Sequence, residues 1–275
     1  MNLPIFALTE DPGPSFFGLL ERTSQWAFPP GGRVELSAKE MDVARLSFPH
    51  GTTIAAIRYD QGVVMAGDRR ATEGNFIAHR RIEKVFPADA HSGVAIAGAA
   101  GPAVEMVRLF KVQLEHYEKV EGTVLSLEGK ANQLSQMIRA NLPMAMQGMV
   151  VVPLFAGWDL ARDMGRIFNY DVTGGRYEEV DYHATGSGGR DARATIKLGF
   201  RENMSMDQAV RLAIRALFEA AEEDSATGGP DPVRGIYPVV AIINSEGYQR
   251  LEDADVATLA AESINAVLIQ RGDSQ

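Results

Sequence analysis

The order of strand-like and helix-like segments is the feature that most restricts the fold of this chain. Four short runs rich in Val, Ile and Ala come first, separated by turns, at 52–59, 63–70, 80–88 and 93–100. Helical spacing follows at 102–120 and 126–142. Strand-like runs then return at 150–159, 165–175 and 180–187, followed by a helix over 205–223, a strand at 236–247 and a last helix from Asp253.

This order predicts an α+β protein. Residues 61–62 read as a hairpin turn, and the first four runs predict an antiparallel sheet. Ser205 and Gln208 have the spacing of a capping box at the start of a helix. Strands, helices, strands and helices in that order predict two antiparallel sheets packed between helical layers.

Charge and composition exclude several classes of function. The chain has 275 residues, a net charge of −9 and no block of basic residues, which disfavours nucleic acid and anionic membranes as partners. It has no cysteine, so thiol nucleophiles and disulfides are excluded, and its five histidines lack the spacing of a metal site. No apolar run reaches roughly 18 residues, and the first ten residues lack the basic start of a signal peptide. A cytoplasmic protein without a metal is therefore expected.

Residues 1–51 differ from the rest of the chain. They hold 6 of its 13 prolines and two pairs of aromatic residues, at 16–17 and at 26 and 28. One interpretation is a flexible N-terminal extension. The other is a removable propeptide whose aromatic side chains bind a partner surface during assembly.

Three residues with reactive side chains, Thr52, Asp68 and Lys84, follow one another at intervals of sixteen residues on the first three predicted strands. Lys84 shares a predicted strand face with Ile82 and Phe86, where an unpaired ammonium group is costly to bury. Lys84 is therefore either functional or extended to the sheet edge, where it pairs with Glu83 or Asp68. The spacing alone leaves both interpretations open.

The chain from residue 52 to about 270 resembles the β-subunits of 20S proteasomes, a family of N-terminal nucleophile hydrolases, and most of all the actinobacterial ones. The motifs that carry the resemblance are TTI at 52–54, GVVMAGDRRAT at 62–72, KVF at 84–86, AGAAG at 97–101, GSG at 186–188 and DSATGGPD at 224–231. The resemblance implies a four-layer αββα sandwich. It also implies a removable propeptide over 1–51 and a catalytic domain over 52–275.

The resemblance further implies a threonine endopeptidase that cuts its own Gly51–Thr52 bond and uses Thr52 as the nucleophile. The freed amine of Thr52, with a reference pKa of about 7.7–8.0, would act as the base. Asp68 and Lys84 would support Thr52, and the backbone N–H of Gly98 would stabilise the anionic intermediate. The residues implied to complete the network are Ser187, Asp224 and Thr227, the last in place of a serine found in many relatives.

The substrate pocket implied by the resemblance is apolar or uncharged. Its positions are Ala71, Thr72, Ile82, Phe86, Ile96, Ala100 and Val104. The expected preference is for apolar or aromatic residues before the cut, although Ile96 and Val104 also fit a purely structural role in the core. The GSGG turn at 186–189 and Asp224 likewise have structural alternatives, a phosphate-binding turn and a helix end.

The resemblance implies partners as well. Copies of this chain would form seven-membered rings that stack with rings of α-subunits into a 28-chain barrel, supplied with unfolded proteins by a ring-shaped ATPase. No cofactor is expected in this chain. Two alternatives remain: a subunit of a shorter two-ring bacterial protease of the same superfamily, with 12 chains, and a non-catalytic ring subunit.

Overall fold

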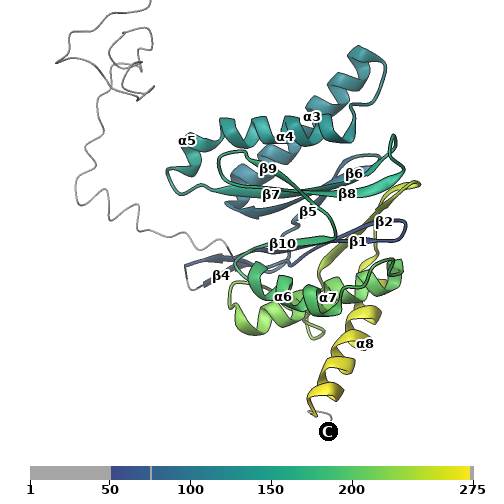
Figure 1. Cartoon of the computed structure of the whole chain (residues 1–275). Helices are drawn as coiled ribbons and strands as arrows, with labels where there is room; N and C mark the ends of the chain where they lie inside the picture. The colour runs from purple at the N-terminus through teal and green to yellow at the C-terminus, as the bar shows by residue number, and fades with distance from the viewer. Residues whose placement is uncertain (1–50, 75, 273–275) are drawn as a thin grey trace, which may run out of the picture. The chain divides into compact units, whose positions relative to one another are not determined.

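The computed structural model describes residues 51–74 and 76–272, so the predicted propeptide lies outside it except for Gly51. Two five-stranded antiparallel sheets lie face to face, and helices cover both outer faces (Figure 1). The predicted sandwich of two antiparallel sheets between helical layers is therefore confirmed. No helix in the described part of the chain combines the length and apolar character needed to cross a membrane.

The first sheet has the strand order β10-β1-β2-β11-β12. These strands are β1 (Thr53–Tyr59), β2 (Gly62–Gly67), β10 (Tyr182–Gly186), β11 (Val239–Asn244) and β12 (Gly247–Arg250). Its outer face is covered by α6 (Gly189–Gly199) and α7 (Met206–Glu223), and α8 (Asp253–Arg271) packs against α7. The predicted hairpin at 61–62 is confirmed, since β1 and β2 pair directly.

The second sheet has the order β5-β6-β7-β8-β9. These strands are β5 (Val85–Asp89), β6 (Ser92–Gly98), β7 (Val151–Asp159), β8 (Met164–Tyr170) and β9 (Arg176–Glu179). It is covered by α3 (Ala100–Glu121) and α4 (Leu127–Ala140), followed by the short α5 (Leu142–Ala145). A separate two-stranded hairpin, β3 (Ala71–Glu73) and β4 (Phe76–His79), belongs to neither sheet.

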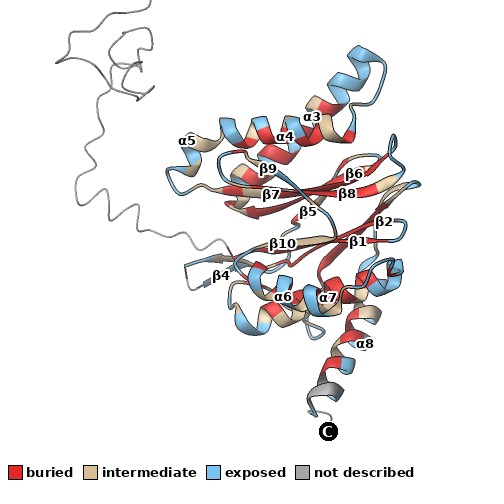
Figure 2. Ribbon diagram, in the orientation of Figure 1, coloured by how far each residue is buried: buried red, intermediate tan, exposed pale blue. Residues whose placement is uncertain are grey.

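The alternation of side chains along β1 shows why two cores meet at this strand. Ile54 and Ala56 point into the apolar layer between the sheets, and Ala55 and Ile57 point into the layer beneath α6 and α7. All four side chains are fully buried, and buried residues fill the central layers (Figure 2). Burial of both faces of β1 leaves its first residues little freedom to move.

The capping box predicted at the start of α7 is present. The Ser205 hydroxyl accepts from the Gln208 backbone N–H, and the Gln208 side chain accepts from the Ser205 backbone N–H. Val210, Ile214 and Leu217, which lie at helical spacing, are buried. This helix ends at Asp224, whose position depends on the helix being correctly packed.

Three predictions about the strands are wrong. The first four predicted strands do not form one sheet, because the β3–β4 hairpin and residues 80–84 carry the chain from the first sheet to the second. The strand predicted at 80–88 begins only at Val85, since the side chains at 80, 81 and 83 are exposed and charged. Lys84 therefore lies just before the strand, with only its carbonyl in the ladder as the acceptor of Ile96 N–H at 2.8 Å.

The strand predicted at 165–175 also ends early. β8 stops at Tyr170 because the Asp171 carboxylate accepts backbone N–H groups of Thr173 and Gly175, which fixes a turn. A new edge strand, β9, then begins at Arg176. The sequence analysis gave no bounds for β9, β12 or α6.

Candidate active site

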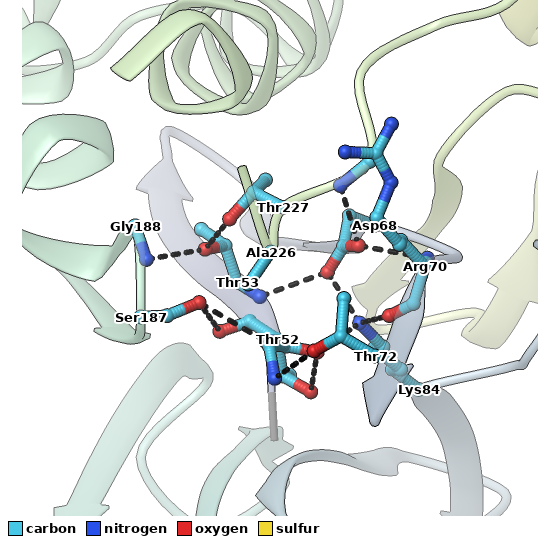
Figure 3. Close-up of polar contacts among 12 residues, drawn as sticks. Thr52, Thr53, Asp68, Arg70, Thr72, Lys84, Ser187, Gly188, Ala226 and Thr227 are labelled. Carbon is cyan, nitrogen blue, oxygen red and sulfur yellow. Dashed lines mark hydrogen bonds and ion pairs between the residues drawn. The ribbon is translucent and has the colours of Figure 1, made fainter. Parts of the chain in front are cut away.

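Thr52 lies directly before β1, and Thr72 of β3 lies close to it (Figure 3). Thr52 is 5% exposed, and its hydroxyl donates to the Gly51 carbonyl oxygen at 2.8 Å. The backbone N–H of Thr52 donates to Ser187 Oγ at 3.2 Å, and its carbonyl accepts from Ser187 N at 2.8 Å. Hydrogen bonds at the Gly51 carbonyl and at the Thr52 N–H therefore fix the position of the peptide bond between the two residues.

Asp68 and Lys84 form a buried ion pair beside this peptide bond. The Lys84 Nζ lies 2.6 Å from Asp68 Oδ1, and the two side chains are 4% and 0% exposed. Lys84 also donates to the carbonyl oxygens of Arg70, at 2.5 Å, and Gly51, at 3.3 Å. The three hydrogens of its ammonium group match these three acceptors, one of which is the carbonyl oxygen of the Gly51–Thr52 peptide bond.

The structure shows where Lys84 lies: the side chain is buried, and its partner is Asp68, one of the two acids that the sequence left open. The side chain does not extend to the sheet edge, and Glu83 pairs instead with Arg250 at 2.5 Å. Burial lowers the pKa of Lys84 below its ordinary value, and the Asp68 carboxylate opposes that effect. Lys84 is thus a buried cation kept beside the Gly51–Thr52 bond by Asp68.

A second carboxylate, Asp224, lies at the C-terminal end of α7. Its Oδ2 accepts from Ser187 Oγ at 2.5 Å and from Thr227 Oγ1 at 2.6 Å, and its Oδ1 accepts from Ala226 N at 3.0 Å. Partial burial alone would raise the pKa of Asp224, but these three donors outweigh burial and lower it. Asp224 is both a helix end and the centre of a polar network that reaches Thr52 through Ser187.

Two glycines near Thr52 are required by close contacts. A Cβ on Gly51 would lie 2.2 Å from the Cβ and 2.4 Å from the carbonyl oxygen of Ala226. Gly98 has a φ of +107°, which other residues rarely adopt, and a Cβ there would lie 2.1 Å from Val150 O. Each glycine allows another backbone segment to approach the site closely.

A small cavity adjoins Thr52, Lys84 and Gly98. Its volume of about 20 Å³ is room for roughly one water molecule. Five of the seven predicted pocket residues line it, namely Ala71, Thr72, Ile82, Ile96 and Ala100. Ala103, which the sequence analysis did not name, lines it too, whereas Phe86 and Val104 pack against the core beneath α3 and α4.

The structure thus brings all seven predicted catalytic residues to one end of the sandwich. Asp68 and Lys84 lie on one side of Thr52, Asp224 and Ser187 lie on the other, and Gly98 lines the cavity. Three residues of this network were not predicted from the sequence. Thr53 and Gly188 are hydrogen-bonded to each other and to the network, and the Arg70 N–H donates to Asp68 Oδ2 at 2.8 Å. The pair of threonines at 52–53 was the signal available for Thr53.

The described residues contain no cluster of three or more His, Asp or Glu side chains placed to hold a metal ion. The reactive groups that the site offers are a hydroxyl, a buried ammonium and two carboxylates. Such a set can attack a carbonyl carbon and stabilise the charge that develops there.

Comparison with known proteins agrees with this arrangement. The family model for proteasome subunits matches residues 48–233. A protein named proteasome subunit beta from Acidimicrobium ferrooxidans is 64% identical over 267 residues, covering 97% of this chain and 95% of its own length. Proteins of the same name from Acidothermus cellulolyticus and Streptomyces griseus are 60% and 59% identical, covering 82% and 81% of this chain and 79% of their own lengths.

These relatives are actinobacterial, as the resemblance implied, and the two-sheet sandwich is consistent with the N-terminal nucleophile hydrolase fold. The match covers Thr52, strands β1, β2 and β10 of the first sheet and the whole of the second sheet, which holds Gly98, and it ends before β11. The chain belongs to the proteasome subunit family and is of the β type.

Proposed function

We propose that this chain is a threonine endopeptidase that first releases its own leader, residues 1–51, and then hydrolyses other peptide bonds with Thr52. The observation that carries the proposal is the contact of Lys84 with the Gly51 carbonyl. A buried ammonium, held by Asp68, lies 3.3 Å from the oxygen that would become negative during attack on the Gly51–Thr52 bond. A buried cation in this position costs stability unless it serves the reaction or is well paired.

Self-cleavage begins with attack of Thr52 Oγ1 on the carbonyl carbon of Gly51. The negative charge that develops on Gly51 O is stabilised by Lys84, which already donates to it. The C–N bond breaks, the Thr52 nitrogen takes the proton given up by the Thr52 hydroxyl, and an ester joins Gly51 to the hydroxyl oxygen. Water hydrolyses this ester, which releases a leader ending in the Gly51 carboxylate and leaves a free amine on Thr52.

The mature residue then acts as both nucleophile and base. The amine of Thr52, directly or through a water, accepts the hydroxyl proton as the hydroxyl attacks a substrate carbonyl. The nearby Lys84 cation disfavours protonation of this amine, which keeps part of it neutral. Ser187 and Asp224 hold the amine from the other side, because Ser187 Oγ already accepts from the Thr52 nitrogen at 3.2 Å.

The pocket favours apolar or aromatic residues before the cut. Ala71, Ile82, Ile96 and Ala100 present apolar side chains to the cavity, and none of the described residues that line it is an acid that could bind a basic substrate residue. The backbone N–H of Gly98 is proposed as an oxyanion donor in the mature site. Phe86 and Val104 do not line the cavity and would affect specificity only by packing against the residues that do.

As a proteasome β-type subunit, the chain assembles with other proteasome subunits. We infer rings of seven copies, stacked with α-subunit rings into a cytoplasmic 28-chain barrel that receives unfolded proteins from a ring-shaped ATPase. The chain itself would need no cofactor. A native mass near that of 12 chains would instead favour the two-ring protease.

The test is the Thr52→Ala variant, with Thr258→Ala on an exposed turn of α8 as the matched control. We expect the wild type and the control to lose 51 of 275 residues, which leaves 224, and to hydrolyse apolar reporter peptides. Thr52→Ala should keep its leader and lack activity, as judged by N-terminal sequencing, intact mass and peptide turnover. Cleavage and turnover by Thr52→Ala would refute the proposal, and an inactive wild type would favour a non-catalytic subunit.

A further inference from the structure

Thr53, the second residue of the threonine pair, is fully buried and reaches both sides of Thr52 (Figure 3). Its backbone N–H donates to Asp68 Oδ1 at 2.8 Å. Its side-chain oxygen lies 2.6 Å from Thr227 Oγ1 and accepts from Gly188 N at 2.9 Å. Thr53 therefore connects the Asp68–Lys84 pair with the network around Asp224.

The number of hydrogens fixes the direction of these bonds. A threonine hydroxyl has one hydrogen, and Thr227 donates its own to Asp224 Oδ2 at 2.6 Å. The hydrogen between the two threonines must then belong to Thr53, whose oxygen accepts from Gly188. The bonds run from Gly188 through Thr53 and Thr227 to Asp224, an arrangement that requires an ionised Asp224 carboxylate.

The same carboxylate determines how Ser187 faces Thr52. Ser187 Oγ is 2.5 Å from Asp224 Oδ2 and 3.4 Å from Thr52 O, so the hydrogen of Ser187 goes to Asp224. The oxygen of Ser187 is then free to accept from the Thr52 nitrogen. The hydrogen-bond series through Thr53 begins at Gly188 and ends at Asp224. Gly188 is next to Ser187 in the chain, and Asp224 accepts from the Ser187 hydroxyl.

We propose that the Thr53 hydroxyl is a positioning group for the peptidase reaction, holding Ser187 and Asp224 in the arrangement that orients the nitrogen of Thr52. The inference rests on the proposed function. In the mature chain the Thr52 amine gives one N–H to Ser187, which restricts the direction of its lone pair. Loss of the Thr53 hydroxyl would free Gly188 and Thr227 to shift, and Ser187 with them.

Gly188 supplies independent support for this role. Its φ of −90° is ordinary for any residue, so its backbone does not require glycine. A Cβ at this position would lie 2.7 Å from Thr227 Oγ1 and 2.8 Å from Thr53 Oγ1. Glycine is therefore needed here for the two hydroxyls to reach each other and the Gly188 N–H.

The first experiment compares Thr53→Val and Thr53→Ser in the purified, assembled particle. Thr53→Val keeps the shape of the side chain but removes the hydroxyl, and Thr53→Ser keeps the hydroxyl. The control is Thr185→Val on the neighbouring strand β10, since the Thr185 hydroxyl has no hydrogen-bond partner in the described part of the chain. Leader removal, kcat, KM and the pH dependence of kcat are measured with one apolar peptide.

We expect Thr53→Val to lower kcat roughly 10-fold to 100-fold, the effect of a displacement of up to about 1 Å. KM should stay within about two-fold, because the hydroxyl does not touch substrate. The acid limb of the kcat profile should move to lower pH, since the Thr52 ammonium form loses its acceptor Ser187. Thr53→Ser should restore both kcat and the profile, and Thr185→Val should change neither.

The second experiment compares Gly188→Ala with Gly189→Ala. A Cβ on Gly189 would lie 3.4 Å from its nearest neighbours, which is an ordinary contact, so the control should behave as wild type. Gly188→Ala should reproduce the loss of kcat although both threonine hydroxyls remain. This pair decides the question if Thr53→Val does not assemble.

Wild-type kcat and pH profile in an assembled Thr53→Val particle would overturn the inference, as would a Thr53→Ser particle that is equally slow. Failure of both Thr53→Val and Gly188→Ala to assemble would also overturn it, because the hydroxyl would then serve folding. These outcomes leave the proposed function intact, since they require an active wild type. A wild type without activity would instead refute the proposed function and the positioning role together.

Discussion

Replacement of Gly51 by alanine tests how the leader junction fits the site. The new Cβ would lie 2.2 Å from Ala226 Cβ, whereas carbon atoms prefer a separation of about 3.5–4.0 Å. Relief of this contact requires a movement of roughly 1.3 Å. Ala226 is hydrogen-bonded to Asp224 at 3.0 Å, so a shift of Ala226 would displace Asp224 and Ser187 as well.

We expect Gly51→Ala to slow leader release roughly 100-fold, the effect of an error of about 1 Å in a reacting geometry. The overpacking itself should destabilise the unprocessed chain by about 1–3 kcal/mol. Release is followed by denaturing gel and intact mass after the subunits are mixed. Ala226→Gly in the same chain should restore the rate only in part, because the Ala226 carbonyl oxygen would remain 2.4 Å from the new Cβ.

Gly101→Ala is the control for this experiment, since its Cβ would meet no atom within 4 Å. It should release the leader at the wild-type rate. Release by Gly51→Ala at that same rate would show that the loop containing Ala226 adapts freely, and the steric argument would fail.

Three further predictions concern the same site. Thr72→Val should slow leader release, followed by intact mass, because it removes the Thr72 Oγ1 acceptor that binds Gly51 N at 3.2 Å; release at the wild-type rate would contradict this. Lys84→Met should lower the free energy of unfolding by about 3–5 kcal/mol in denaturant titrations, because it leaves the Asp68 carboxylate buried without its cation; an unchanged midpoint would contradict this. The pKa of Asp224 is lowered from its ordinary 3.8, so the ionised carboxylate stabilises the fold above that pH, and this stabilisation is lost as the pH falls through the folded-state pKa. The melting temperatures of wild type and Asp224→Asn should therefore converge at low pH. Melting temperatures that keep a constant difference across the pH range would be inconsistent with this.

The sequence predicted the layers, but the residue pattern alone left the partner of Lys84 open between Glu83 and Asp68. The choice between Glu83 and Asp68 depends on Arg250, in β12, which pairs with Glu83 from a strand far along the chain. The prediction of a single sheet failed for a related reason. Local patterns identify strands, but whether consecutive strands pair depends on the connection between them, here the short hairpin at 71–79.

The pocket and the hydrogen-bond network show the same limit. Phe86 alternates correctly with Lys84 along the chain, yet the strand begins between them and Phe86 packs beneath α3. Thr53 could not be assigned a role from its position, because its partners Gly188 and Thr227 lie 135 and 174 residues away. Hydrogen-bond direction also depends on the ionised state of Asp224, which requires the folded surroundings of that carboxylate.

The four strands at the margins of the two sheets limit how copies of this chain can associate. β10 and β5 have five residues, β12 and β9 have four, and β5 contains Pro87, which has no N–H to donate. Short, charged or proline-containing margins resist the addition of a foreign strand. These edges therefore disfavour strand pairing between copies of the chain at the high local concentration of a multi-subunit particle. We expect helices and loops to form its contacts with neighbouring subunits.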